Sequence, residues 1–114
     1  MARTVSAAVT RTTTGEHVLF TVPPKNTGLW SMMFVSSTAG TESPKVYWWD
    51  SDTSTKYTIL QGKNLGVGEY ILLSDAVVAL QENDEIRVEN AGTNALTYVA
   101  TIELRPAEAI QFHS

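Results

Sequence analysis

Apolar and polar residues alternate along most of this chain, in short runs separated by turn-forming residues. The longest run begins at Leu96, where an apolar residue occupies every second position as far as Leu104. A period of two is typical of a β-strand with one buried face. Runs of this kind predict strands over residues 17–22, 29–37, 45–50, 56–60, 69–74, 85–89 and 96–104. Residues 3–10 could be a strand or an extended arm, and residues 75–80 a short strand or a helical turn.

The residues between these runs are those that favour turns. Pro23 and Pro24 end one run, because proline cannot donate to a β-ladder. The polar segment 50–54 predicts a hairpin between two aromatic strands, and residues 91–94 predict another hairpin. Seven to eight short strands predict an all-β, antiparallel β-sandwich of jelly-roll-like form. We expect one domain over residues 1–114, with a core at about 17–104 and arms at 1–14 and 106–114.

Composition agrees with this fold and excludes several classes of function. Val, Thr and Ile, which suit strands, make up 31 of the 114 residues. There is no cysteine, which excludes disulfides and thiolate metal sites. No apolar run is long enough to cross a bilayer, and the N-terminus lacks the apolar segment of a secretion signal. The net charge of −4 argues against nucleic acid as a partner.

The sequence offers no convincing catalytic or metal-binding pattern. His17 and His113 are the two histidines and stand far apart. The segment 50–54 begins like a calcium loop but lacks the later ligands. The acidic residues of 82–85 are interpreted as a solvated turn rather than an acid/base pair. We therefore expect no enzyme, no cofactor and no metal.

Three of the expected strands carry large apolar side chains on both faces, although a sandwich buries only one face of each. Alternation predicts Phe34, Trp48 and Leu72 in the core. The opposite faces would then form an exposed apolar surface, and such surfaces often mark interfaces. The alternative is that loops or arms cover them. The expected interface residues on these strands are Met33, Val35, Tyr47, Trp49, Ile71 and Leu73.

The two ends of the chain add a second expected interface. Residues 1–57 carry five basic and four acidic groups, whereas residues 58–114 carry three basic and eight acidic groups. A weakly basic N-terminal arm with Arg3, Val5 and Arg11 could dock on an acidic neighbour. Ile110 and Phe112 place two apolar groups in the C-terminal arm. We expect these arms to reach neighbours in a homo-oligomer or a larger lattice, the alternative being loose, solvated termini.

Four segments in a fixed order carry a resemblance to a known family. They are residues 20–23, residues 46–57, residues 80–88 and residues 96–104. Together they resemble the small all-β virion proteins of tailed bacteriophages, over roughly residues 17–104. Asn83 departs from that family, which usually has glycine in this turn. The resemblance implies a structural virion protein, most directly a capsid decoration or cement subunit, whose partners are the major capsid protein or neck and tail proteins.

Other functions stay open at this point. A neck, tail or fibre accessory protein is the nearest alternative. A carbohydrate-binding module is a second, in which aromatic residues near the 50–54 turn would stack on a glycan. Adjacent Trp48 and Trp49 must point to opposite faces of a strand, so they cannot share one such platform. We expect Trp48 to point inward and Trp49 outward. A jelly-roll ligand of the C1q/TNF type is a third, weakened by the missing export signal and cysteines.

Overall fold

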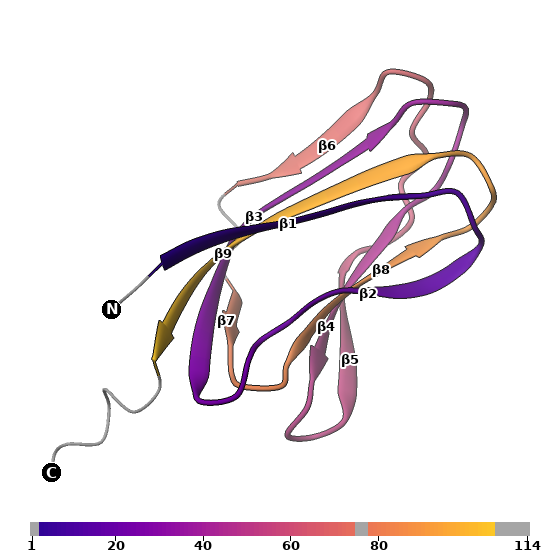
Figure 1. Ribbon diagram of the computed structural model, residues 1–114. Helices are drawn as coiled ribbons and strands as arrows, with labels where there is room; N and C mark the ends of the chain where they lie inside the picture. Colours follow the sequence, from indigo (N-terminus) through magenta and orange to yellow (C-terminus); the bar gives the residue numbers. More distant parts are fainter. Residues whose placement is uncertain (1–2, 75–77, 107–114) are drawn as a thin grey trace, which may run out of the picture.

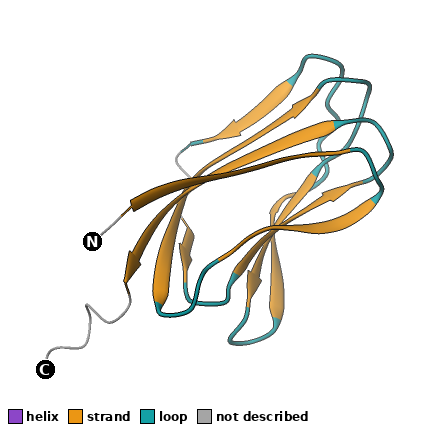
Figure 2. Ribbon diagram, in the orientation of Figure 1, coloured by secondary structure: helices purple, strands orange, loops and turns teal. Residues whose placement is uncertain are grey.

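The computed structural model describes residues 3–74 and 78–106, which form nine β-strands. Figure 2 shows strands joined by loops, with no helix among these residues. The strands are β1 (Arg3–Arg11), β2 (Gly15–Thr21), β3 (Asn26–Ser37), β4 (Lys45–Asp50), β5 (Thr55–Leu60), β6 (Tyr70–Leu73), β7 (Val78–Leu80), β8 (Glu85–Asn90) and β9 (Leu96–Pro106). The strands expected from alternation are therefore all present, and the open segment 75–80 contains β7.

The strands form two antiparallel sheets that face each other (Figure 1). Sheet A has the order β1-β9-β3-β6, and β7 also pairs with β3, beyond the end of β6. Sheet B has the order β2-β8-β4-β5. With β6 and β7 taken as one interrupted strand, the described residues form eight strands, and the chain crosses repeatedly between two four-stranded sheets. This is the jelly-roll arrangement, as the sequence predicted.

The core lies between the sheets and is supplied by alternate residues of each strand. β9 is central in sheet A, and its five inward residues from Leu96 to Leu104 are all at most 2% exposed. Ile86 and Val88 of β8 are fully buried opposite them in sheet B. Other core residues are Val22, Trp30, Met33, Val35, Val46, Leu65 and Leu80.

The N-terminal segment is a strand of the domain and not an arm. Residues Arg3 to Arg11 pair with Leu104 to Leu96 of β9 at nine successive positions, without a shift in register. Val5 and Val9 pack against the core from this strand. The expected N-terminal arm over residues 1–14 is thus wrong for residues 3–11. The weak apolar pattern arises because β1 is an edge strand with small outward residues.

A β-bulge in β3 reverses the two faces that simple alternation assigns there. The pairing with β9 shifts between Trp30 and Met32, so Trp30 and Met33 point to the same side. Met33 and Val35 are 2% and 1% exposed and belong to the core. Their assignment to an interface was wrong, because one extra residue inverts every later position of the strand.

The faces of β6 also differ from those that alternation assigns, because β6 pairs with the part of β3 that follows the bulge. Ile71 lies opposite Val35 and Leu73 opposite Met33, so both follow these residues into the sandwich. Ile71 and Leu73 pack against the core. Leu72, which alternation placed in the core, is instead 50% exposed. The expected interface role of Ile71 and Leu73 is therefore also corrected.

A buried network fixes one end of the sandwich. Residues 91–94 do not form the expected hairpin turn, because β8 belongs to sheet B and β9 to sheet A. Asn90 is 1% exposed and holds this crossing in place. Its amide donates to the carbonyl oxygens of Arg11 and Asn94, and its side-chain oxygen accepts from the Tyr98 hydroxyl at 2.6 Å. Burial, with the Glu42 charge nearby, raises the pKa of Tyr98.

Asp84 fixes the other end and is buried, contrary to its interpretation as part of a solvated turn. Its carboxylate is reached by the Trp48 indole, by the backbone N–H groups of Ser51 and Gln81, and by the Ser51 hydroxyl, all at 3.0–3.1 Å. Burial by itself would raise the pKa of Asp84, but these hydrogen bonds lower it below its ordinary value. Asp84 thus ties the β4–β5 hairpin to the start of β8.

Candidate functional site

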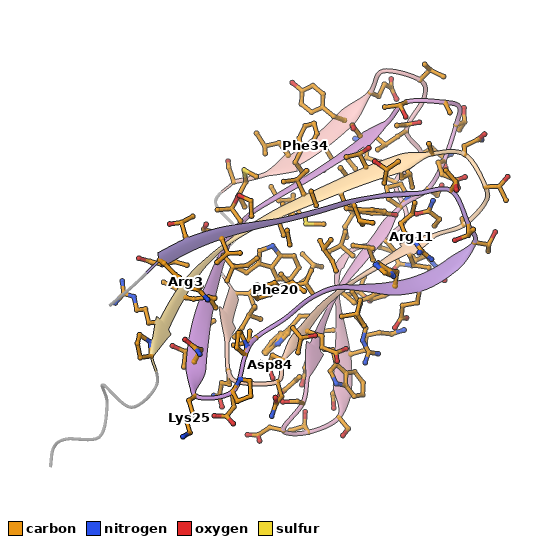
Figure 3. All side chains as sticks on the ribbon, viewed as in Figure 1. Arg3, Arg11, Phe20, Lys25, Phe34 and Asp84 are labelled. Atoms are coloured by element: carbon orange, nitrogen blue, oxygen red, sulfur yellow. The ribbon has the colours of Figure 1, made fainter. Side chains whose placement is uncertain are left out.

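The outward surface of sheet A carries a continuous apolar row across all four strands. Leu72 of β6 lies beside Phe34 of β3, Phe34 beside Val99 of β9, and Val99 beside Ala8 of β1. Figure 3 shows Phe34 on the side of sheet A that faces away from the sandwich interior. The row exists because the bulge in β3 turns Phe34 outward while Met33 and Val35 point inward.

Two further rows flank this one, and none of their residues is charged. The first contains Tyr70, Ser36, Thr97 and Thr10, in which the Thr10 and Thr97 hydroxyls share a hydrogen bond of 2.9 Å. The second contains Met32, Thr101 and Ser6. We call the three rows together the neutral face: Ser6, Ala8, Thr10, Met32, Phe34, Ser36, Tyr70, Leu72, Thr97, Val99 and Thr101.

The most exposed apolar groups of the neutral face lie at its β6 side. Tyr70 is 63% exposed and Leu72 is 50% exposed. The rings of Phe34 and Tyr70 have centroids 5.6 Å apart, so the two side chains form one aromatic cluster. Large exposed apolar side chains that are grouped in this way are typical of a surface that binds another protein.

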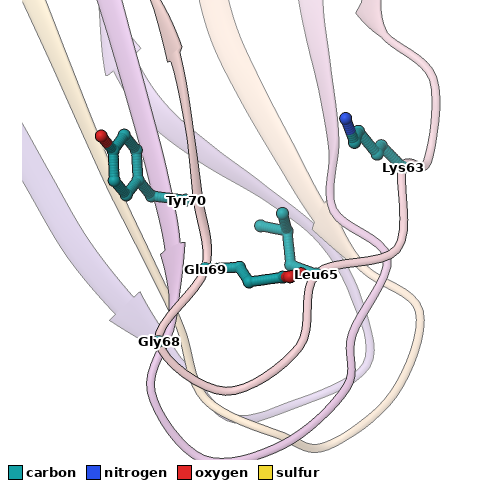
Figure 4. Close-up of a pocket in the computed structure, with 5 residues that line it drawn as sticks. All are labelled: Lys63, Leu65, Gly68, Glu69 and Tyr70. Atoms are coloured by element: carbon teal, nitrogen blue, oxygen red, sulfur yellow. The ribbon is translucent and has the colours of Figure 1, made fainter.

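A shallow hollow of about 410 Å³ adjoins the neutral face (Figure 4). It is lined by Lys63, Leu65, Gly68, Glu69 and Tyr70. Glu69 is engaged in the adjacent turn, because its carboxylate accepts from the backbone N–H of Gly66 at 2.7 Å. Lys63 and Glu69 are the basic and acidic side chains of its lining.

The outward surface of sheet B has the opposite character, because charged side chains cover its aromatic rings. The Lys56 ammonium lies 4.3 Å from the centre of the Tyr47 ring, and the Arg87 guanidinium 4.2 Å from the centre of the Trp49 ring. Tyr47 is only 6% exposed. We call this surface the charged face; it comprises Glu16, Lys56, Glu85, Arg87 and Glu89 with Tyr47 and Trp49.

Ion pairs join the charges of this face to one another. Glu16 accepts from Lys56 at 2.7 Å and from Arg87 at 3.1 Å, and Arg87 also donates to Glu85 at 2.7 Å. Partial burial would raise the pKa of Glu16, but the two cations bring it below its ordinary value. Burial and the nearby Glu89 carboxylate raise the pKa of Tyr47 to about 12. The charged face thus satisfies its own charges and covers its rings without a partner.

The two tryptophans separate as expected. Trp48 packs against the core and stacks on Tyr57 with ring centroids 5.0 Å apart. Trp49 lies on the outer surface of the same strand beneath Arg87. The expectation that Tyr47 and Trp49 lie on the second face is confirmed, but both rings are covered by cations. Tyr47 and Trp49 therefore do not offer bare rings on which a sugar would stack, whereas Tyr57, stacked on Trp48, is 44% exposed.

The remaining expected interface residues are in three different places. Arg3 is exposed at the start of β1, Val5 packs against the core, and Arg11 lies at the end of β1 near β2 (Figure 3). Ile110 and Phe112, in the expected C-terminal arm, lie outside the described residues. Sequence reasoning missed Phe34, Tyr70 and Leu72 as surface residues, although their two-sided apolar strands were the correct signal.

The described part of the chain contains no cluster of three or more His, Cys, Asp or Glu side chains that could hold a metal ion. His17 is partly buried, and burial together with the Arg11 charge lowers its pKa. Within residues 3–74 and 78–106 there is also no helix with the length and apolarity needed to span a bilayer.

Neither a protein-family model nor a curated protein sequence matches this chain. Solved structures with the same fold do exist. A chain from the acidic stable capsid of Helicobacter pylori bacteriophage KHP30 is 14% identical with a TM-score of 0.57, and 93% of this chain and 94% of that chain are covered. A chain from Bacillus endospore appendages, described as disulfide-linked pili, is 10% identical with a TM-score of 0.55, covering 93% and 86%.

A chain from infectious bursal disease virus is 6% identical with a TM-score of 0.60. The match covers 94% of the present chain and 35% of the viral one, so this chain spans about a third of that protein. At such low identities these likenesses show the fold alone. The chain is thus a small all-β protein whose jelly-roll fold also occurs in capsid and pilus structures.

Proposed function

We propose that this chain is a non-enzymatic structural subunit of a phage virion, most directly a capsid decoration or cement protein. The neutral face is the observation that carries the proposal. It presents Tyr70, Leu72 and Phe34 to solvent on a regular four-stranded surface, whereas the charged face satisfies its own charges. The neutral face is therefore the surface through which the subunit contacts the particle.

The expected binding energy is small for each residue and grows with the number of residues covered. Covering the exposed halves of Tyr70 and Leu72 contributes roughly 1 kcal/mol each, from the usual value for burial of apolar surface. The hydroxyl groups of Thr10, Ser36 and Thr97 can hydrogen-bond to a partner without the desolvation cost of a charge. Binding of this kind depends little on salt, because screening acts mainly on charges.

The comparison with the phage KHP30 capsid supports the proposed location. That likeness covers nearly all of both chains, so a chain of about this length and fold is present in a phage capsid. The pilus likeness supports assembly as a general property of the fold. Neck, tail or fibre positions use the same kind of contact, and they differ from the capsid in the partner protein.

The test is to purify particles of the phage that encodes the chain and to measure its copy number by quantitative mass spectrometry. A capsid subunit is expected at a copy number comparable to that of the shell protein, whereas a neck, tail or fibre protein is expected at a few copies for each particle. Absence from the particles, with the protein recovered only in the soluble lysate, would refute a virion role. Glycan-array binding in that case would support the carbohydrate-binding alternative.

A further inference from the structure

Three of the four sheet edges are protected against pairing with another chain. β2 and β5 lie at the edges of sheet B, and the pairing of each contains a register shift, between Val18 and Phe20 and between Val46 and Tyr47. The far edge of sheet A consists of β6 and β7, which have only four and three residues. Bulges and short length are the usual means by which proteins prevent strand addition at an edge.

β1, the remaining edge, has none of these protections. It pairs with β9 over nine positions without a shift, and its seven residues between Arg3 and Arg11 are small or β-branched and uncharged. Figure 1 shows β1 as the outermost strand of sheet A, with no described strand alongside it opposite β9. The inward residues Val5, Ala7 and Val9 are only half-buried, and no described strand adjoins β1 on this side.

The Arg11 side chain provides a second, independent indication. Its Nε is buried and has no hydrogen-bond partner among the described residues. His17 lies near enough for the Arg11 charge to lower its pKa, and Glu42 and Glu89 act with Arg11 on the pKa of Tyr98, but none of the three forms a hydrogen bond or ion pair with Arg11. A partner cannot reach the enclosed Nε, but the Arg11 side chain as a whole is only half-buried and forms no ion pair among the described residues. A carboxylate from a partner could therefore pair with the accessible part of the guanidinium.

We infer that residues 108–114 of a second copy of this chain add to β1 as an antiparallel strand. Their alternation matches β1 in one register. Glu108 then lies opposite Arg11, Ile110 opposite Val9, and Phe112 opposite Ala7. This register supplies a carboxylate to Arg11 and places the large Phe112 against the small Ala7.

The strand must come from a second copy because of where the described chain ends. Arg3, the first residue of β1, pairs with Leu104 of β9. β9 ends two residues later, at Pro106, so the described chain ends beside the Arg3 end of β1. In the antiparallel register, Glu108 lies at the Arg11 end. The two ends of a nine-residue strand are roughly 26 Å apart at about 3.3 Å per residue, and the two residues from 106 to 108 span roughly 7 Å.

The contact buries main-chain groups along the only unprotected edge among the described strands and leaves the neutral face free. If two copies each donate their C-terminal segment to the other, they form a closed dimer. If each copy donates to a different neighbour, the copies form a ring or a fibre. The inference does not depend on the proposed virion function, because self-association can be measured without any particle.

The test measures the molar mass of the full chain by analytical ultracentrifugation over a range of concentrations. The wild type is expected to self-associate. Phe112→Lys should weaken self-association by about tenfold or more, because it places a charge opposite Ala7 inside the new strand pair. Gln111→Lys is the matched control: it adds the same charge one position away, on the opposite side of the strand, and should associate like the wild type.

A charge exchange and a cross-link then test the register. Glu108→Arg alone should weaken association, and Arg11→Glu combined with Glu108→Arg should restore it. Because the chain has no cysteine, a tagged copy with Val9→Cys and an untagged copy with Ile110→Cys can be joined by a short bis-maleimide. A tagged–untagged product is expected, with much less from Val5→Cys and Ile110→Cys. A monomeric wild type, or equal association of Phe112→Lys and Gln111→Lys, would overturn the inference.

Discussion

Replacing Asp84 by alanine tests the account of how the end of the sandwich is held. Asp84 is 1% exposed and accepts four hydrogen bonds, from the Trp48 indole, from the backbone N–H and hydroxyl of Ser51, and from the backbone N–H of Gln81. Asp84→Ala removes the acceptor for all of them. Three of the donors are N–H groups in fixed positions, which cannot turn to find another acceptor.

The magnitude follows from the number of donors left without a partner. A buried donor that loses its acceptor costs about 1–3 kcal/mol, and water reaches some of these groups, so the free energy of unfolding should fall by about 3–5 kcal/mol. In a domain of this size 1 kcal/mol corresponds to about 4 °C, which gives a fall in Tm of about 12–20 °C. Asp52→Ala, at an exposed position in the β4–β5 hairpin, should change stability by less than about 0.5 kcal/mol.

The pH dependence has a definite sign. The folded protein lowers the pKa of Asp84, so the ionised carboxylate contributes stability at pH values above the ordinary aspartate pKa, and this contribution is lost as the pH falls through the lowered value. Urea unfolding should therefore show a larger difference between wild type and Asp84→Asn at pH 7 than at about pH 3. The account fails if Asp84→Ala costs no more than Asp52→Ala, or if the Asp84→Asn difference is the same at both pH values.

Three further predictions concern stability and ionisation. Met33→Ala should cost about 2–5 kcal/mol in urea unfolding, whereas Met32→Ala, on the neutral face, should cost less than half as much; equal losses would refute the bulge assignment. Trp48→Ala should cost about 3 kcal/mol and Trp49→Ala about 1 kcal/mol, because only Trp48 packs on the core and bonds to Asp84; a larger loss at Trp49 would contradict this. In ultraviolet titration, Tyr47→Phe should remove a phenol that ionises at about pH 12, and an unchanged curve would show that Tyr47 does not have the raised pKa.

Most of the strands could be predicted from the sequence because each has a clear period of two and a turn at each end. β9 and β8 are the simplest cases, since all their inward residues follow strict alternation. β1 was harder, because an edge strand with small residues has almost the same pattern as an extended arm. The connection from β8 to β9 resembles a hairpin turn in sequence, and only the pairing of both strands with other partners shows that it crosses between sheets.

The presence of an exposed apolar surface could be predicted from the sequence, but not the residues that form it. Two-sided apolar strands correctly indicated surplus apolar surface, but the bulge between Trp30 and Met32 decides which side is exposed. No residue type marks that bulge, because Ser31 and Met32 fit a regular strand equally well. The sequence also did not indicate that Lys56 covers the Tyr47 ring. Lys56 forms an ion pair with Glu16 of β2, which is 40 positions away in the sequence and comes close only in the folded sheet.

The most direct test of the central claim is the fraction of added protein that sediments with phage particles lacking it, compared between the two outer faces. Leu72→Asp places a charge in the apolar row of the neutral face, and Thr58→Asp places the same charge at an exposed position beside Tyr47 in sheet B. The account predicts that Leu72→Asp loses most of its binding, that Thr58→Asp binds like the wild type, and that wild-type binding persists in high salt. Unchanged binding by Leu72→Asp, or loss of binding by Thr58→Asp alone, would contradict it.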